Sequence, residues 1–475
     1  MKFATKEILE KIDEYISTHR EEILSDLISL VRIPSVRSRA EDGAPYGKEC
    51  RRALEAVVEL YKKNGIDARI DPEGNYAISS FGKGEKTVGI FAHADVVPAD
   101  GEWLMTDPFE PIIKDGYIFG RGTEDDKSGI IEALYATKII RELGIGFNSN
   151  LTIFTGANEE SGMGDIAAFI RNEKMPDASV IPDGDYPCYT GECSLFRFKL
   201  TSKHSLASIS GAHGGEATNI ILGAISAEVS DAALLAELAE AAKTNERISI
   251  EGSKVTAKGL STHVMHADQS LNAAKVLAEA LLGCPSLPEC DRATLDSIVT
   301  LLSSPFGHGL SINHDDENFG KLVCGTGVVR MTDDARIMLT FDVRVGLSYP
   351  LDELRTDAIK ASEALWSFEE TNSSVGYYIP EGSMIRTVLE NTYGELAGLP
   401  EIKGSNTAGG THARKMKNAM PIGTVADYKK KPITLPEGHG GVHQPDECMS
   451  VEGFLEGIKI LTAMVLELDG ALRGI

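Results

Sequence analysis

Long hydrophobic runs are absent from the sequence. No stretch reaches the roughly 18 apolar residues that a membrane-spanning helix needs, so we expect no membrane segment. Residues 1–32 also lack the apolar core of a secretory signal. Their apolar side chains instead recur at helical spacing, at Ile8, Leu9, Ile12, Tyr15 and Ile16. We therefore expect the chain to start with a helix.

Cysteine is scarce. The seven cysteines are scattered, their number is odd, and none forms a C-x-x-C pair. This pattern suggests neither a thiolate zinc site nor a disulfide framework. The cytoplasm, a reducing compartment, is the simplest expected location for such a chain.

Positive charge is also in short supply. Lysine and arginine total 47 residues against 71 of aspartate and glutamate, which gives a formal net charge of −24. Such a chain cannot present a broad basic surface to phosphates, so we expect no nucleic-acid partner. The surplus of negative charge mainly favours solubility.

The length of 475 residues exceeds what one hydrophobic core usually supports, so we expect two or three domains. In the first part, short apolar runs alternate with helical patterns. The expected strands are 68–70, 76–78, 87–92, 151–155 and 180–181, and the main expected helix is 128–143. This alternation is typical of an α/β fold with a mixed, mostly parallel sheet and helices on both faces. Ligands on such sheets bind outside the carboxyl ends of the strands.

The pattern changes after about Cys193. Strand-like alternation occurs at 196–200, 247–257 and 338–345, and helical stretches lie between, at 231–244 and 271–282. Antiparallel strands with helices on one face predict a separate α+β domain. Helix–strand alternation resumes near Pro380 and ends with a helix at 451–468. We therefore expect a catalytic domain of residues 1–190 and 381–475, interrupted by an inserted domain of residues 191–380.

Short polar clusters stand mostly where apolar runs end. They are His93-Ala94-Asp95, Asp125-Asp126, Glu159-Glu160, Asp183, His263 and His443. Each alone has an ordinary explanation, because an aspartate before a helix often caps it and a loop histidine is often structural. Their common position after strand-like or glycine-rich segments indicates one shared site instead.

The residue types together suit a site for two divalent cations. His93 and Asp95, two apart on a strand, face the same side, so His93 can bind a metal while Asp95 orients its ring. One aspartate of the 125–126 pair can bridge two ions about 3.5–4 Å apart. Adjacent glutamates in extended chain point to opposite sides, so one of the 159–160 pair would bind metal and the other would serve as general base.

Charge balance supports this interpretation. Two neutral imidazoles, three carboxylates and one hydroxide balance two divalent ions, and a low-dielectric cleft favours such neutrality. Nitrogen and oxygen ligands without thiolate suit Zn²⁺, with Mn²⁺ or Co²⁺ as alternatives. The sequence contains no H-E-x-x-H, which excludes the single-zinc design built on that motif.

These motifs resemble the co-catalytic metallopeptidases that include carnosinase, carboxypeptidase G, aminoacylase and acetylornithine deacetylase. The resemblance spans nearly the whole chain. It rests on His93-Ala94-Asp95, Gly120-Arg121-Gly122 before Asp125-Asp126-Lys127, Glu159-Glu160-Ser161-Gly162, Pro182-Asp183 and His443-Gln444-Pro445. Residues 310–316, 325–327 and 409–414 are similar to the peptidase V-type bacterial dipeptidases. The resemblance implies that the inserted α+β domain has ferredoxin-like parts and acts as a lid.

The resemblance also implies a role for each site residue. Asp125 would bridge two metal ions, whose other ligands would be His93 and Asp183 at one ion and Glu160 and His443 at the second. Glu159 would be the general base, and Asp95 would orient His93. The Asp125–Asp126 peptide bond would be cis.

Three residues would act on the substrate. His263 would stabilise the oxyanion of the tetrahedral intermediate, and Asn219 would hold the substrate near it. Arg414 would bind a free carboxylate bidentately. Within this last motif the chain departs from the family, because His412 stands where an aromatic residue is more usual.

The expected function is a metal-dependent dipeptidase that acts on small peptides as a monomer. The metals would polarise the scissile carbonyl and supply hydroxide, and Glu159 would shuttle the proton. A first alternative is an amidohydrolase acting on N-acyl amino acids with the same metals. A second is a non-catalytic binding protein, which would have no use for a general base.

Overall fold

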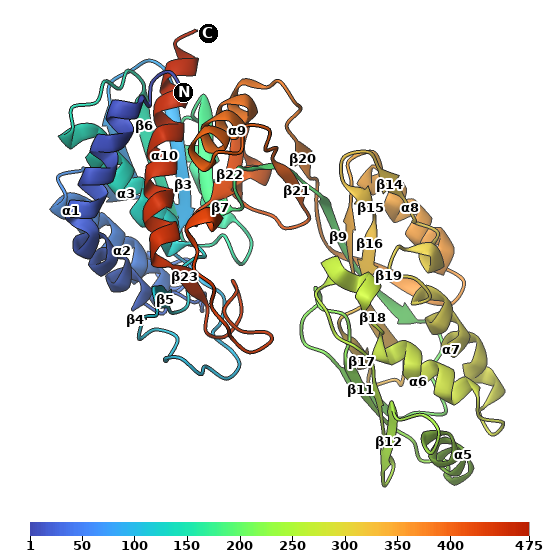
Figure 1. Cartoon of the computed structure of the whole chain (residues 1–475). Helices are drawn as coiled ribbons and strands as arrows, with labels where there is room; N and C mark the ends of the chain where they lie inside the picture. Colours follow the sequence, from blue (N-terminus) through green and yellow to red (C-terminus); the bar gives the residue numbers. More distant parts are fainter. Residues whose placement is uncertain (475) are drawn as a thin grey trace. The chain divides into compact units, whose positions relative to one another are not determined.

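The computed structural model describes residues 1–474 and divides into two compact units (Figure 1). The first unit comprises Met1–Thr190, Ile379–Ser405 and Gly410–Ile475, and the second comprises Gly191–Tyr378 with Asn406–Gly409. The second unit is therefore inserted into the first. The boundaries expected from sequence, 190 and 380, lie beside two of these crossings, whereas the return of residues 406–409 to the second unit was not foreseen.

A six-stranded sheet forms the centre of the first unit, in the order β1–β2–β6–β3–β7–β22. The strands are β1 (Ala68–Ile70), β2 (Tyr76–Gly82), β3 (Thr87–His93), β6 (Asn150–Gly156), β7 (Ala178–Gly184) and β22 (Ala419–Gly423). Strands β6, β3, β7 and β22 pair in parallel, and β1 and β2 are antiparallel. The expected mixed, mostly parallel sheet is confirmed.

Helices cover both faces of this sheet, because strands buried on two sides need apolar cover on each. One face packs against α1 (Lys6–Val31), α2 (Lys48–Lys63), α3 (Lys127–Glu142), α9 (Met384–Ala397) and α10 (Val451–Leu472). Figure 1 shows α10 running beside α1 and α3. On the opposite face, Phe169 of α4 (Gly164–Asn172) packs against Phe91 and Phe154. Ile90 faces the first core and Phe91 the second, as strand alternation requires.

A small antiparallel sheet lies beside the central one and had no clear signal in the sequence. It consists of β4 (Ile112–Lys114), β5 (Tyr117–Phe119) and β23 (Cys448–Ser450) in the order β23–β5–β4. Its strands are too short for periodicity to reveal them. The sheet joins the chain just before residue 120 to the chain just after residue 447.

The second unit is an α+β domain built on a nine-stranded antiparallel sheet. Its strand order is β12–β13–β11–β10–β17–β18–β9–β19, with β16 also paired to β18. The strands are β9 (Ser194–Ser202), β10 (Gly211–Gly214), β11 (Ala224–Glu228), β12 (Ile248–Glu251), β13 (Lys254–Lys258), β16 (Val323–Gly325), β17 (Val329–Met331), β18 (Ile337–Val345) and β19 (Trp366–Ser374). One hydrophobic core joins the sheet to α5 (Ala232–Ala242), α6 (Ala273–Leu282), α7 (Glu289–Leu301) and α8 (Leu351–Ser362). The expected fold class is confirmed here too.

One strand of the second unit was expected wrongly. Residues 247–257 form a hairpin of β12 and β13 rather than a single strand, with Glu251 opposite Lys254. Gly252 turns the chain with a φ of +63°, which glycine adopts without strain.

Small elements occur where the chain passes between the units. Strands β8 (Tyr189–Glu192), β20 (Tyr377–Tyr378) and β21 (Ser405–Thr407) form a three-stranded sheet at these crossings. Among residues 1–474, none of the helices combines the length and the apolar character that a membrane crossing requires.

Candidate active site

The candidate site lies at the carboxyl edge of the central sheet. His93 is the last residue of β3, and Asp183 is the last but one of β7. The turn with Glu159 and Glu160 follows the end of β6. Because β3, β6 and β7 run in parallel, their carboxyl ends meet at one edge, where ligands of such sheets gather.

Asp125 lies between two imidazoles. Its Oδ1 is 3.0 Å from His93 Nε2, and its Oδ2 is 2.9 Å from His443 Nε2. His93 Nε2 is also 3.8 Å from Asp183 Oδ2, and His443 Nε2 is 3.2 Å from the Glu160 carboxylate. The structure thus brings the five candidate ligands together, from segments that are far apart in the sequence.

The loop before α3 presents Asp125 in this position. The Asp125–Asp126 peptide bond is cis, as the resemblance implies. Asp126 stands at the N-cap of α3 without a side-chain capping bond, and its Oδ2 instead accepts the backbone N–H of His93 at 3.0 Å. The ordinary explanation of a capping Asp126 is therefore wrong.

Asp95 organises the two glutamates as well as His93. Its backbone carbonyl oxygen is 2.9 Å from His93 Nδ1. Its carboxylate accepts the backbone N–H of Glu159 at 3.0 Å and that of Glu160 at 3.2 Å. The glutamates therefore lie in a turn held by Asp95, and the expectation of extended chain is wrong at this point.

The titration behaviour of the cluster reflects crowded charges in a buried setting. Burial and the neighbouring Asp183 carboxylate raise the pKa of Glu159 well above its ordinary value. Burial also acts to raise the pKa of Asp125, but the close His443 and His93 imidazoles outweigh it and hold that pKa well below the ordinary value. The pKa values of these two carboxyl groups are thus shifted in opposite directions, a pattern typical of active sites.

His443 titrates differently from an isolated histidine. Burial acts to lower its pKa, but Asp125 and Glu160 outweigh that effect and raise the pKa to about 11. Because its side chain is 53% exposed, solvent screens part of this attraction. The surrounding carboxylates therefore favour a cation at this position.

The chemistry of these side chains fits divalent metal ions. Buried His93 Nε2 makes no hydrogen bond although Asp125 Oδ1 is 3.0 Å away, and Glu159 Oε1 is also buried without a hydrogen-bond partner. Two groups of side chains could each hold a metal ion, because within each group the potential ligand atoms lie within 4.8 Å of one another. The first group is His93, Glu159 and Asp183, and the second is His93, Asp125 and Glu160. Unpaired imidazole nitrogen and carboxylate oxygen are the ligands that Zn²⁺ takes in catalytic sites.

A family comparison agrees with this geometry. Residues 89–467 match the model of peptidase family M20/M25/M40. The chain belongs to this family. Membership confirms that this M20 protein is a hydrolase of the peptidase type, and it confirms the resemblance drawn from the sequence motifs.

One relative of this M20 peptidase matches nearly its whole length, and another matches part of it. It is 24% identical over 470 residues to the Bacillus subtilis (strain 168) protein named "Putative dipeptidase YtjP", covering 94% of this chain and 97% of the relative. It is 33% identical over 189 residues to the Staphylococcus aureus (strain USA300) protein named "Putative dipeptidase SAUSA300_1697", covering 39% of this chain and 40% of that relative.

Solved structures show the same fold. The di-peptidase Dug1p from Saccharomyces cerevisiae aligns with a TM-score of 0.61 and 16% identity, over 99% of each chain. Human carnosine dipeptidase 1 aligns with a TM-score of 0.57 and 16% identity, over 97% of this chain and 100% of the other. At this level of identity the comparison establishes the fold alone.

Two buried residues of the M20 site were missed from the sequence. His412 Nε2 is 3.3 Å from Asp165 Oδ1, and its ring lies perpendicular to those of His93 and Phe154. Asp165 also accepts the N–H of Asn158 at 2.8 Å, at the start of the glutamate turn. His412 thus packs as an aromatic residue would and adds a polar contact. Its departure from the family pattern was the one signal available in the sequence.

The three predicted substrate residues lie on two different units. Arg414 belongs to the first unit, in the short 3-10 helix His412–Lys415, close to Gly410. Asn219 and His263 belong to the second unit, where Asn219 Nδ2 is 3.4 Å from His263 Nε2. The backbone N–H of Val264 donates to Asn219 at 2.9 Å and fixes this pair locally.

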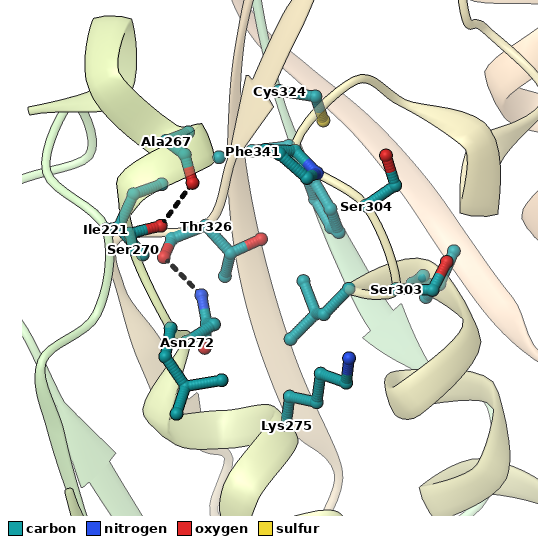
Figure 2. Close-up of a pocket in the computed structure, with 15 residues that line it drawn as sticks. Ile221, Ala267, Ser270, Asn272, Lys275, Ser303, Ser304, Cys324, Thr326 and Phe341 are labelled. Atoms are coloured by element: carbon teal, nitrogen blue, oxygen red, sulfur yellow. Dashed lines mark hydrogen bonds between the residues drawn. The ribbon is translucent and has the colours of Figure 1, made fainter. Parts of the chain in front are cut away.

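A separate pocket of about 110 Å³ lies within the second unit (Figure 2). Asn272, Lys275, Ser303 and Thr326 contribute its polar lining, and Asn272 Nδ2 donates to the Thr326 carbonyl at 2.9 Å. None of the ten predicted site residues lines it. The pocket is therefore not the candidate active site.

Proposed function

We propose that this M20 peptidase hydrolyses the peptide bond of dipeptides at a site for two divalent metal ions, with Glu159 as general base. One observation carries the proposal: the two carboxylate oxygens of Asp125 each face a different imidazole, at 3.0 and 2.9 Å. A carboxylate placed in this way is suited to bridge two ions.

The proposed ligands divide into two sets that share Asp125. His93 and Asp183 would complete one set, and Glu160 and His443 the other. By distance, Glu159 lies near His93 and Asp183, and Glu160 lies near His93 and Asp125. We assign Glu160 to the metal because its carboxylate also contacts His443, and Glu159 to proton transfer because burial raises its pKa.

The protein's own groups would then perform distinct tasks. Zn²⁺, or Mn²⁺ or Co²⁺ in its place, would polarise the scissile carbonyl and lower the pKa of a water molecule. Glu159 would accept the proton of the attacking water and deliver it to the leaving amine, for which a carboxyl pKa closer to neutrality is favourable. Asp95 would hold both Glu159 and His93 in place.

Three residues would recognise the substrate. We propose that His263 donates to the developing oxyanion, that Asn219 supports the substrate beside it, and that Arg414 binds the free carboxylate. An arginine fork suits that carboxylate, and it would restrict the enzyme to short peptides. The proximity of Asn219 and His263 supports a shared role for that pair.

The names of relatives favour dipeptides over the alternative substrates. The Bacillus subtilis relative and the yeast structure both carry a dipeptidase name. An amidohydrolase acting on N-acyl amino acids would use the same metal ligands and differ only in substrate recognition. We also propose that the enzyme acts in the cytoplasm and that it is a monomer. Light scattering on the purified protein would check the oligomeric state.

One experiment tests the proposal directly. Protein stripped with a chelator would be supplied with Zn²⁺, Mn²⁺ or Co²⁺ in turn and assayed on a dipeptide panel and on matched N-acetyl amino acids. We expect metal-dependent cleavage of dipeptides. Preferential cleavage of the N-acetyl compounds would favour the amidohydrolase, and no turnover with any metal would favour a binding protein.

A further inference from the structure

The loop that carries Asp125 is held by Glu447, a buried residue to which the proposed mechanism gives no role. Glu447 Oε1 accepts the backbone N–H groups of Gly122 at 3.0 Å, Glu124 at 3.1 Å and Asp125 at 3.3 Å. Its Oε2 accepts a hydrogen bond from Arg121 Nη1 at 2.6 Å. One carboxylate thus receives four donors from five consecutive residues, 121–125.

Complete burial makes these contacts strong. Glu447 is 0% exposed and Arg121 is 1% exposed. Hydrogen bonds to an ionised group are shorter and stronger than neutral ones, and a low dielectric strengthens them further. A displacement of the Glu447 carboxylate would therefore move the backbone of Asp125, whose own N–H is one of the donors.

The loop that carries His443 ends at the same carboxylate. This loop closes on itself, because Gly440 N–H donates to the Pro445 carbonyl at 2.9 Å and Cys448 N–H donates to the Gly440 carbonyl at 3.1 Å. The Glu447 carbonyl in turn accepts the N–H of Gly120 at 2.9 Å. Glu447 therefore connects the two loops through both its side chain and its backbone.

Asp446, next to Glu447 in the sequence, also anchors the loop that carries His443. Its Oδ1 accepts the backbone N–H of Leu104 at 2.9 Å and of Met105 at 2.8 Å, and its Oδ2 is 2.7 Å from His439 Nδ1. His443 lies between His439 and Asp446 in the sequence, so its loop is fixed on both sides. The position of His443 relative to Asp125 is consequently set by residues 446 and 447.

We propose that Glu447 is a positioning residue that fixes the position of Asp125 relative to His443. It thereby sets the affinity of the site for its metal ions. This inference rests on the proposed metal site. Glutamate suits the task because both its oxygens accept, one from three amides and the other from Arg121. Glutamine would offer one oxygen and turn an amide N–H₂ group toward a donor.

The test compares Glu447→Gln with a matched control, Glu390→Gln. Glu390 is also a buried acid of the first unit; it pairs with Arg386 at 2.8 Å and accepts the N–H of Gly404 at 3.1 Å, without contact to the candidate ligands. Both variants lose the same charge from a buried arginine pair. Zn²⁺ affinity would be measured by calorimetry on chelator-treated protein, alongside the melting temperature without metal.

We expect Glu447→Gln to bind Zn²⁺ roughly 10–100-fold more weakly, the range typical of residues that support metal ligands. Glu390→Gln should bind within about threefold of wild type even if its melting temperature falls as far. Unchanged affinity in Glu447→Gln, or equal losses in both variants, would overturn the proposal.

A second variant keeps the test decisive if Glu447→Gln does not fold. Glu447→Asp retains the charge but shortens the reach by one methylene, so it too should weaken Zn²⁺ binding, and wild-type affinity would overturn the proposal. Failure of the wild-type protein to bind Zn²⁺, Mn²⁺ or Co²⁺ would instead refute the proposed metal site, a result distinct from failure of the Glu447 inference.

Discussion

The Asp95 carboxylate accepts the backbone N–H of Glu159 at 3.0 Å. Asp95, two residues after the proposed ligand His93, is thereby linked to the proposed general base. The same carboxylate also holds Glu160, at 3.2 Å. Three functional side chains thus depend on one buried aspartate. The turn that separates the two glutamates into different roles is imposed from 64 residues earlier in the chain.

Asp95→Asn should therefore impair catalysis. The amide offers one acceptor oxygen in place of two and turns an N–H₂ group toward a backbone donor, so the glutamate turn should shift. We expect kcat to fall roughly 10–100-fold, as for other residues that support metal ligands. Steady-state kinetics with saturating Zn²⁺ would measure this effect.

The matched control is Asp71→Asn. Asp71 is a buried aspartate that accepts the N–H of Tyr76 at 3.0 Å, at the turn between β1 and β2. Its substitution should lower the melting temperature and leave kcat unchanged. Equal losses of kcat in the two variants would mean that Asp95 acts through general stability alone.

The two adjacent glutamates should respond differently to the same substitution. Glu159→Gln should retain bound metal but lose roughly 10²–10⁴-fold in kcat, the usual contribution of general acid–base catalysis. Glu160→Gln should lose metal affinity instead, because its carboxylate is 3.2 Å from His443 Nε2. Metal content after dialysis, combined with kcat at saturating metal, separates the two effects. The reverse pattern would exchange the proposed roles.

Much of this site could be predicted from the sequence because its elements are locally encoded. Strands β3, β6 and β7 are short apolar runs buried on both faces, and α3 and α10 show clear apolar patterns. Once those elements are recognised, the rule for parallel sheets places His93 and Asp183 at one edge.

The residues that were missed depend on partners far away in the chain. His412 pairs with Asp165 across 247 residues, and Glu447 reaches Gly122 across 325. No local pattern identifies an acidic residue that binds the backbone of a distant loop, because the residues nearest to it in the sequence are not the ones it contacts. The hairpin at Gly252-Ser253 is different, because a glycine–serine pair between alternating runs is a recognised turn signal that could have been used.

Arg414→Lys should weaken recognition of the substrate carboxylate. Lysine cannot form the paired hydrogen bonds of a guanidinium, and hydrogen bonds to charged groups contribute about 1.5–3 kcal/mol, or roughly 10–100-fold in kcat/KM. The loss should appear mainly in KM for free dipeptides. Dipeptide amides, which lack the carboxylate, should be cleaved equally by variant and wild type.

The neighbouring cation supplies the control for Arg414. Lys415→Arg exchanges lysine for arginine at an exposed position one residue away and should leave KM unchanged. If Arg414→Lys weakened cleavage of amides and free dipeptides alike, Arg414 would support the fold of its segment rather than bind the carboxylate.

Glu132 should make stability depend on pH. This carboxyl lies on α3, is 0% exposed, and neither of its oxygens has a hydrogen-bond partner, so burial raises its pKa well above the ordinary 4.5. Between the unfolded and folded pKa values the folded chain binds one more proton than the unfolded chain. The stability contribution of Glu132 therefore falls as pH rises through that window, by about 1.4 kcal/mol per pH unit.

Glu132→Gln tests this relationship, because the amide has nearly the same shape and carries no charge at any pH. We expect the free energy of unfolding of wild type, relative to Glu132→Gln, to decrease steadily from pH 5 upward until the folded pKa is reached. Urea titrations at several pH values would measure the difference. Glu59→Gln, at an exposed position of α2, should show no such trend. A constant difference between wild type and Glu132→Gln across pH 5–8 would show that Glu132 ionises in the folded protein without penalty.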